Sequence, residues 1–276
     1  MRKADMTSVL YTHGSTPVVA SQVDPRLHYC LHVPRDLPSD RLAPLVVIQH
    51  GTGRTAQKYR TAMRDFADQH GAVILAPIFP AGLIDPDDVH NFKFISYRGI
   101  RFDHMLLTII DEIAARYPVD AHRFYLHGFS GGGQFTHRFL FLHPDRLAAA
   151  SIGAPGRITQ LDDSLPWWLG TKEFEQRFGK PIDLATVRRV PVHMVVGSED
   201  TDTFEINNPG DSNWMDGCEK TGLTRIERLQ TLRRNFEANG ISVKFDLVEG
   251  LGHRGMGVLP TVRQFFGDLI ARQGLR

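Results

Sequence analysis

Short apolar runs and amphipathic stretches alternate along most of the chain. Apolar positions at helical spacing predict helices over 55–70, 101–117 and 134–142, and a final helix that carries Val262 and Ile270. Alternating strands and helices are typical of a mainly parallel sheet with helices on both faces. We therefore expect an α/β protein with about eight strands. The apolar runs place buried strands, of which we expect the first two to be antiparallel, at 27–34, 44–50, 72–78, 123–127, 148–152, 191–196 and 243–248.

One further helix carries its boundary signals in the sequence. Thr224 and Glu227 have the spacing of a capping box, and an apolar stripe from Ile226 to Phe236 follows them. Gly240 then supplies a stop signal. We expect a helix between these two points, just before the last strand.

Two segments interrupt the alternation, at 156–189 and 201–222. Irregular stretches longer than about 12–15 residues are uncommon in compact domains unless they serve a function. We expect both to lie at the rim of a functional site, with 156–189 as a short insertion after strand 6 that forms a lid or rim. A chain of 276 residues with 42% hydrophobic content can bury a large core, so we expect 1–276 to form a single domain.

Charge and composition narrow the range of partners. The formal net charge is +1 with both signs interspersed, which gives no electrostatic reason to expect nucleic acid as a partner. No run reaches the ~18 apolar residues of a membrane helix, and the N-terminal segment lacks the apolar stretch of a secretory signal. We expect a cytoplasmic protein without membrane insertion. Cys30 and Cys218 are too few for a disulfide framework or a zinc site, and the oligomeric state stays open.

The strongest chemical signal is the sequence Gly128-Phe129-Ser130-Gly131-Gly132, which stands between a predicted strand and a predicted helix. This G-x-S-x-G pattern in a strand-to-helix turn is the nucleophile elbow of serine hydrolases, where small neighbours permit a very sharp turn. The turn would hold the serine hydroxyl clear of the sheet. Ser130 is our candidate nucleophile.

A serine hydroxyl is a weak nucleophile, so it needs a general base and a group that orients that base. In this arrangement the acid and the histidine follow the serine in that order. His253 comes after the last predicted strand and is the expected base. Asp200, three residues after Gly197, is the expected acid, while Asp202 stays open as an alternative. We expect Glu199 to point into solvent.

The segment His50-Gly51-Thr52-Gly53 ends an earlier strand, at the place where such folds supply an oxyanion-hole amide. The backbone N–H groups of Thr52 and Gly131 are the expected donors to the negative oxygen of a tetrahedral intermediate. His50 would have a buried, hydrogen-bonded structural role, because this chemistry needs backbone amides and not an imidazole.

The same segment also fits a competing pattern. Gly51, Gly53 and Ala56 match the G-x-G-x-x-A fingerprint of dinucleotide-binding proteins. That function needs a carboxylate at the end of the following strand for the ribose hydroxyls, and the strand at 72–78 leads into Phe79 and Pro80 with no acid. The hydrolase interpretation is therefore favoured.

These motifs resemble those of the α/β-hydrolase superfamily, in its polyhydroxybutyrate-depolymerase-like, feruloyl-esterase-like and dienelactone-hydrolase-like branch. The resemblance covers most of the chain. It rests on HGTGRTAQKY, on RFYLHGFSGGGQFTHRFLFLHPDR and on the ordered segments GSED and GLGH. It implies Ser130, Asp200 and His253 as a catalytic triad, with Thr52 and Gly131 as oxyanion donors.

From the residues and the resemblance together we expect a serine hydrolase that cleaves a small-molecule carboxylic ester or related acyl substrate, without a metal or an organic cofactor. An acyltransferase, thioesterase or peptidase with the same triad stays open, as does a non-catalytic binding protein. Bulky aromatic residues in the irregular segments are candidates for substrate contacts or for packing: Trp167, Trp168 and Trp214.

Overall fold

The computed structural model of the protein describes residues 12–37, 41–203, 209–211 and 213–273. Among these residues the main element is a nine-stranded sheet with the order β1-β3-β5-β4-β8-β9-β10-β11, in which β2 pairs with β3 beside this path. All neighbouring pairs from β5 to β11 are parallel, and β3 is antiparallel to β5. The strands are β1 (Gly14–Ser15), β2 (Val19–Ala20), β3 (His28–Val33), β4 (Leu45–Gln49), β5 (Val73–Ile78), β8 (Phe124–Phe129), β9 (Leu147–Gly153), β10 (Val192–Gly197) and β11 (Val243–Val248).

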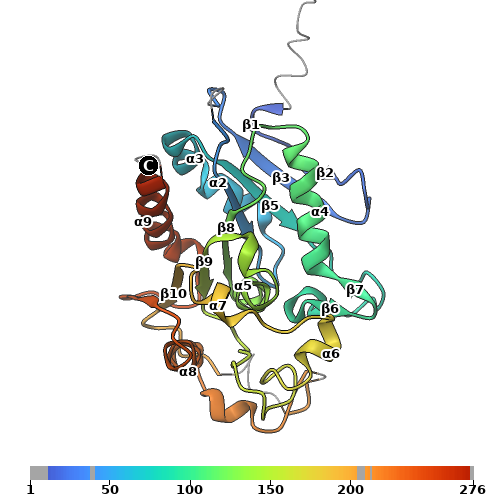
Figure 1. Cartoon of the computed structure of the whole chain (residues 1–276), viewed down its shortest axis with the longest axis vertical. Coiled ribbons are helices and arrows are strands. Elements are labelled where there is room, and N and C mark those ends of the chain that lie inside the picture. The colour runs from blue at the N-terminus through green and yellow to red at the C-terminus, as the bar shows by residue number, and fades with distance from the viewer. Residues whose placement is uncertain (1–11, 38–40, 204–208, 212, 274–276) are drawn as a thin grey trace, which may run out of the picture.

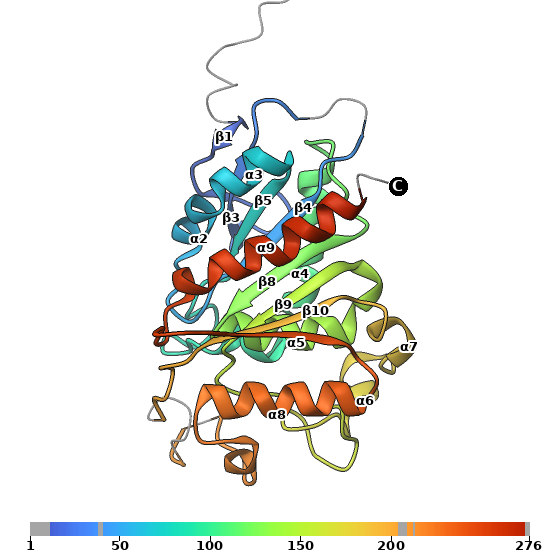
Figure 2. The ribbon, with the colours of Figure 1, turned by 90° about the vertical axis from the view of Figure 1, so that its left-hand side faces the viewer.

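Helices cover both faces of this sheet. Figure 1 shows α2 (Ala56–Ala62), α3 (Arg64–His70) and α9 (Gly255–Gln273) on one face, and α4 (Phe102–Ala114) and α5 (Gly131–Leu142) on the other. The helix α8 (Arg225–Ala238) lies beside α5, where the rings of Phe141 and Phe236 are 5.7 Å apart, and Figure 2 shows it below the sheet. The expected α/β architecture is confirmed.

The central strands are buried on both sides. Every residue of β4, β8, β9 and β10 is buried, which is why these strands read as continuous apolar runs. The helix α5 is also buried along its whole length because it packs on β8 and β9. The elements that lead into the candidate site are therefore fixed from all sides.

One of the two expected antiparallel strands is parallel to its neighbours. We expected the strands at 27–34 and 44–50 to be antiparallel. This holds for β3, which is antiparallel to β5, but β4 lies between β5 and β8 and is parallel to both. The apolar pattern of a strand reports that it is buried, not which strand lies beside it. Since β4 is buried throughout, it occupies a central position, and only β3 with the short β1 and β2 forms the antiparallel edge.

The expected helix at 55–70 is in fact two helices. It breaks at Met63, which has φ −96° and ψ 2° and separates α2 from α3. Near the break the buried guanidinium of Arg60 donates hydrogen bonds to the carbonyls of Thr16 and Leu31. This contact with the edge of the sheet holds α2 in place. The spacing of apolar residues within 55–70 could not predict it, because its partners lie elsewhere in the chain.

Short elements complete the described structure. The segment 156–189 contains α6 (Phe174–Phe178) and α7 (Leu184–Val187), and a small hairpin pairs β6 (Ser96–Tyr97) with β7 (Ile100–Arg101). Three 3-10 turns are present: η1 (Asn91–Phe94), η2 (Pro144–Arg146) and η3 (Cys218–Thr221). None of the helices in the described ranges combines the length and apolar character needed to cross a bilayer.

Candidate active site

Ser130 lies in the sharp turn between β8 and α5. Its backbone has φ 57° and ψ −115°, a conformation that residues other than glycine rarely adopt. Its N–H donates to the carbonyl of Gly153, and its carbonyl accepts from the N–H of Gln134, the first turn of α5. Strain of this kind persists only where the surrounding structure enforces it, and it is often found at functional sites.

The glycines around Ser130 are required by close backbone contacts. A Cβ atom at Gly128 would lie 2.3 Å from the carbonyl oxygen of Gly132, and one at Gly132 would lie 2.4 Å from that of Gln49. A Cβ at Gly133 would lie 2.3 Å from the oxygen of Gly153. The first turn of α5 therefore packs directly on the ends of β4 and β9, and the glycine-rich sequence is what permits it. This helix begins at Gly131, earlier than the residue 134 that we expected.

His253 and Asp200 are joined by a short hydrogen bond. The Nδ1 atom of His253 is 2.6 Å from Oδ2 of Asp200. Because an ionised carboxylate only accepts hydrogen bonds, Nδ1 carries the hydrogen and Nε2 is the basic nitrogen of the ring. The ring also packs in a tilted arrangement on Phe129, the residue before Ser130, at 4.8 Å between centroids. Two loops that follow β10 and β11 thus meet beside the nucleophile turn.

The three acids after β10 differ in their surroundings. Asp200 is 1% exposed and contacts His253, whereas Glu199 and Asp202 are exposed. The geometry therefore favours Asp200 over the alternative Asp202.

Asp200 has a second partner that the sequence analysis missed. Its other oxygen, Oδ1, accepts a hydrogen bond at 3.2 Å from Nη1 of Arg225. Arg225 is 2% exposed and is the first residue of α8, directly after Thr224, whose side chain forms the expected capping box with Glu227. The sequence contained one indication that Arg225 could lie near the site: it begins a capped helix directly after the long loop that follows Asp200. The acid is thus held between an imidazole and a guanidinium.

The two expected oxyanion donors lie close together. A Cβ atom at Gly131 would be 3.2 Å from the backbone nitrogen of Thr52, so the two residues are close neighbours, and Gly131 directly follows Ser130. His50 fixes this loop, because its Nδ1 donates to the carbonyl of Gly51 while its Nε2 accepts from the N–H of Phe79. Burial lowers the pKa of His50 to about 3, which keeps the ring neutral in these two bonds. This agrees with the expected structural role.

The three candidate tryptophans belong to one apolar cluster. Trp168 is 7% exposed and clusters with Cys218, and the half-buried Trp214 packs against the same cluster. Trp167 lies with its ring 5.0 Å from that of Phe178 in α6. Packing is therefore the role that the contacts show for all three, and a contact with substrate stays a prediction.

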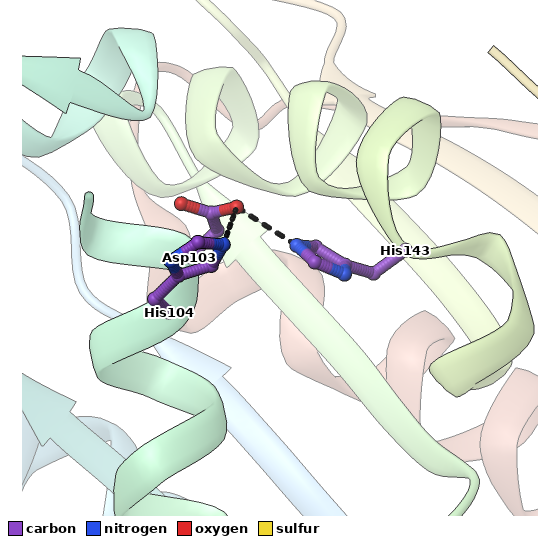
Figure 3. Close-up of side chains that lie close together, drawn as sticks. All are labelled: Asp103, His104 and His143. Atoms are coloured by element: carbon purple, nitrogen blue, oxygen red, sulfur yellow. Dashed lines mark hydrogen bonds and ion pairs between the residues drawn. The ribbon is translucent and has the colours of Figure 1, made fainter. Parts of the chain in front are cut away.

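A second group of ionisable side chains lies away from the turn that holds Ser130. Figure 3 shows Asp103 next to His104 and His143. Asp103 is fully buried, and Arg101 donates to both of its oxygens while Nε2 of His143 lies 2.8 Å from Oδ2. Burial raises the pKa of Asp103, but the hydrogen bonds from His143 and Arg101 outweigh it and hold that pKa well below its usual range. A metal ion would have to displace a guanidinium here, so this group is better described as an ion-pair network that joins α4 to α5.

The fold can be compared with solved structures. LpqC, a poly(3-hydroxybutyrate) depolymerase from Bordetella parapertussis, superposes with a TM-score of 0.74 at 21% sequence identity, over 95% of this chain and 93% of that one. Poly(aspartic acid) hydrolase-1 from Sphingomonas sp. KT-1 gives a TM-score of 0.74 at 19% identity, over 92% and 98% of the two chains. The protein has the α/β-hydrolase fold.

Sequence comparison is consistent with this hydrolase fold. Feruloyl esterase B from Neurospora crassa is 28% identical over 122 residues, which are 41% of this chain and 40% of that protein. The chain spans well under half the length of the curated relatives that it matches. No family model matches the sequence. The expected resemblance to polyhydroxybutyrate-depolymerase-like and feruloyl-esterase-like proteins is confirmed.

Proposed function

We propose that this protein is a serine hydrolase that cleaves a carboxylic ester through an acyl-enzyme intermediate. The observation that carries this proposal is the hydrogen bond between His253 and Asp200 beside the strained turn at Ser130. Similar proteins named as esterases and depolymerases support the ester as substrate class. No step of the proposed reaction needs a metal or an organic cofactor.

In the proposed reaction His253 first accepts a proton from Ser130 and later donates it to the leaving alcohol. Nε2 of His253 takes the proton of the Ser130 hydroxyl as the oxygen attacks the ester carbonyl, and Asp200 stabilises the imidazolium that forms. The N–H groups of Thr52 and Gly131 stabilise the negative oxygen of the tetrahedral intermediate. When this intermediate collapses, the alcohol leaves with the proton from His253. Water then attacks the acyl-enzyme with the same assistance and releases the acid.

We also propose that the segment 156–189 forms a fixed wall beside the site and not a lid that opens. Buried arginines from two helices hold the first part of this segment, from Gly156 to Trp168, against the body of the protein. Arg228 donates to the carbonyl of Gly156, and Nε of Arg138 donates at 2.8 Å to Oγ1 of Thr159, which in turn donates to the carbonyl of Trp168. The half-buried Trp214 packs against the same apolar cluster as Trp168 and adds to this wall.

The proposal is tested by covalent labelling followed by turnover assays. A fluorophosphonate probe should add to Ser130, as read by mass spectrometry, and Ser130→Ala should neither label nor hydrolyse a chain-length series of 4-nitrophenyl esters. Ser164→Ala, an exposed serine of the wall, is the matched control and should behave as wild type. An adduct on another residue, or undiminished turnover by Ser130→Ala, would refute the proposal. Adding alcohols and thiols as competing acceptors tells a hydrolase from an acyltransferase.

A further inference from the structure

The peptide unit between Gly51 and Thr52 lies directly beside the nucleophile. A Cβ atom at Gly51 would be 3.6 Å from Cβ of Ser130 and 3.1 Å from the carbonyl oxygen of Phe129. The N–H of Thr52, the proposed oxyanion donor, belongs to this peptide unit. Because a trans peptide is planar, with its C=O and N–H on opposite sides, the groups that bind the Gly51 carbonyl also set the direction of the Thr52 N–H.

Two donors hold the carbonyl of Gly51. Nδ1 of His50 donates to it at 2.8 Å, and the backbone N–H of Arg54 donates to it at 3.2 Å, which closes a tight turn over residues 51–54. Arg54 has φ 49°, in the left-handed region that residues other than glycine rarely adopt. A backbone of this kind persists where the surrounding contacts enforce it.

The side chain of Arg54 holds the next peptide unit. Its Nη1 donates at 2.7 Å to the carbonyl of Thr52. The same nitrogen donates at 2.8 Å to the carbonyl of Val89, while Nε donates at 3.1 Å to that of Phe79 and Nη2 at 3.1 Å to Oδ1 of Asn91. All four acceptors are neutral oxygens, so the guanidinium acts here as a rigid fork of donors. Both carbonyls that flank Thr52 are therefore fixed.

These contacts also connect the two proposed oxyanion donors. Asn91 is 1% exposed and begins η1, and the carbonyl of Lys93 in the same turn accepts at 2.7 Å from Nη1 of Arg138 in α5. The first residue of α5 is Gly131, the second donor. Through η1, Arg54 thus joins the segment 50–53 to the helix that carries the other amide.

We propose that Arg54 is a positioning residue of the oxyanion hole, which holds the N–H of Thr52 in the direction of the negative oxygen of the tetrahedral intermediate. This inference rests on the proposed function, because it assigns a role within the same reaction. Arg54 acts through the backbone of Thr52. Donors that are fixed before charge develops stabilise the transition state more than the bound substrate. Loss of this side chain should therefore slow the reaction and leave substrate binding unchanged.

Steady-state kinetics with a 4-nitrophenyl ester test the inference, with kcat expressed per Ser130 that a fluorophosphonate probe labels at completion. Arg54→Met removes the donors and keeps the backbone strain at this position. It should lower kcat by roughly 30-fold, less than the loss of a whole oxyanion donor, and leave KM within about twofold. A trifluoromethyl ketone with the same acyl group forms an adduct that places an oxyanion where the intermediate does. Its Ki should rise by about the same factor.

Two further variants complete this test. Arg54→Lys keeps a charged donor and should recover part of the lost kcat and of the affinity for the ketone, and thermal unfolding should show both Arg54 variants folded. If Arg54→Met does not fold, Arg54→Lys should still show a smaller loss of kcat that its Ki follows. Arg64→Met is the matched control, because Arg64 is an exposed arginine of α3 whose partner at 3.2 Å is the adjacent exposed Asp65. It should leave kcat, KM and Ki at the wild-type values.

Two results would overturn the inference. One is wild-type kcat and Ki per labelled site in the folded Arg54 variants, with or without a lower thermal midpoint. The other is a rise in KM at unchanged kcat, which would assign Arg54 to substrate binding. In both cases labelling of Ser130 and turnover by the wild type would show that the proposed function stands, whereas a wild type that neither labels nor turns over would refute that function itself.

Discussion

Asp200 lies with Oδ2 2.6 Å from Nδ1 of His253, and the pair joins two loops that are far apart in the sequence. Asp200→Asn should lower kcat by about 10⁴-fold, because the amide cannot hold the ring in the required tautomer or stabilise the imidazolium. Glu199→Gln, a neighbouring exposed acid, should leave steady-state kinetics with a 4-nitrophenyl ester nearly unchanged. A large loss in Asp202→Asn, with near-native turnover in Asp200→Asn, would make Asp202 the acid.

Arg225 is expected to act as a positioning residue for Asp200. It pairs with the oxygen of Asp200 that does not face His253, and both side chains are buried. Arg225→Gln should lower kcat by about 10-fold with little change in KM and should also alter the pH profile of kcat, because the buried acid loses its cation. The same change should lower the free energy of unfolding by about 3 kcal/mol.

The matched control lies on the same helix. Arg234→Gln removes an exposed arginine whose guanidinium donates to the hydroxyl of Thr231, so both the kinetics and the urea unfolding should match those of wild type. A loss of stability in Arg225→Gln without any change in kcat or in the pH profile would reduce Arg225 to a structural role.

The strained backbone of Ser130 predicts a difference between two inactive variants. Glycine adopts φ 57° and ψ −115° readily, whereas alanine keeps the strain of the serine. Ser130→Gly should therefore be more stable than Ser130→Ala by about 1 kcal/mol in urea unfolding, although glycine makes the unfolded chain more flexible. Equal or lower stability of the glycine variant would show that the turn is not strained in solution.

The contact between Gly132 and β4 predicts a severe effect of one methyl group. A Cβ atom there would lie 2.4 Å from the carbonyl oxygen of Gln49, and backbone on both sides cannot move aside. Gly132→Ala should lower the free energy of unfolding by about 2 kcal/mol and reduce labelling of Ser130, because the turn is displaced. Gly210→Ala, where nothing lies within 4 Å of the added carbon, should unfold like wild type.

Buried histidines predict a loss of stability in mild acid. Burial lowers the pKa of His127 to about 3. Burial is also the main reason why the pKa of His193 is lowered to about 4. Both rings are neutral in the folded protein but take up a proton in the unfolded chain as the pH falls below ~6.5, so stability decreases with falling pH from there towards the folded pKa. For His127 alone the difference at pH 5 is about 2 kcal/mol.

The measurement is urea unfolding at pH 7.5 and pH 5.0. His127→Phe, which removes one titrating ring, should lose about 2 kcal/mol less than wild type between the two pH values. His104→Phe, at an exposed position, is the control and should follow wild type. An equal loss in wild type and His127→Phe would show that His127 is not the source of the acid sensitivity.

The sequence by itself determined the class of fold, and it pointed to the residues of the candidate site. Buried strands are apolar throughout and surface helices are apolar on one side, so most elements could be placed from the pattern alone. The turn at Ser130 could be located because its glycines are a local requirement of backbone geometry. Likewise, Thr224 and Glu227 marked the start of α8, because a helix cap is formed by residues next to one another in the chain.

Only the tertiary structure decided which distant groups meet. The order of the strands, which puts β5 between β3 and β4, depends on how whole strands pack and not on the composition of any one of them. The pairing of Arg225 with Asp200 and the hydrogen bonds of Arg54 to Phe79 and Asn91 depend in the same way on loops from different strands that end at one edge of the sheet. A single arginine or lysine in a sequence most often lies in solvent. Burial and a partner from far along the chain give it a role, and both exist only after folding.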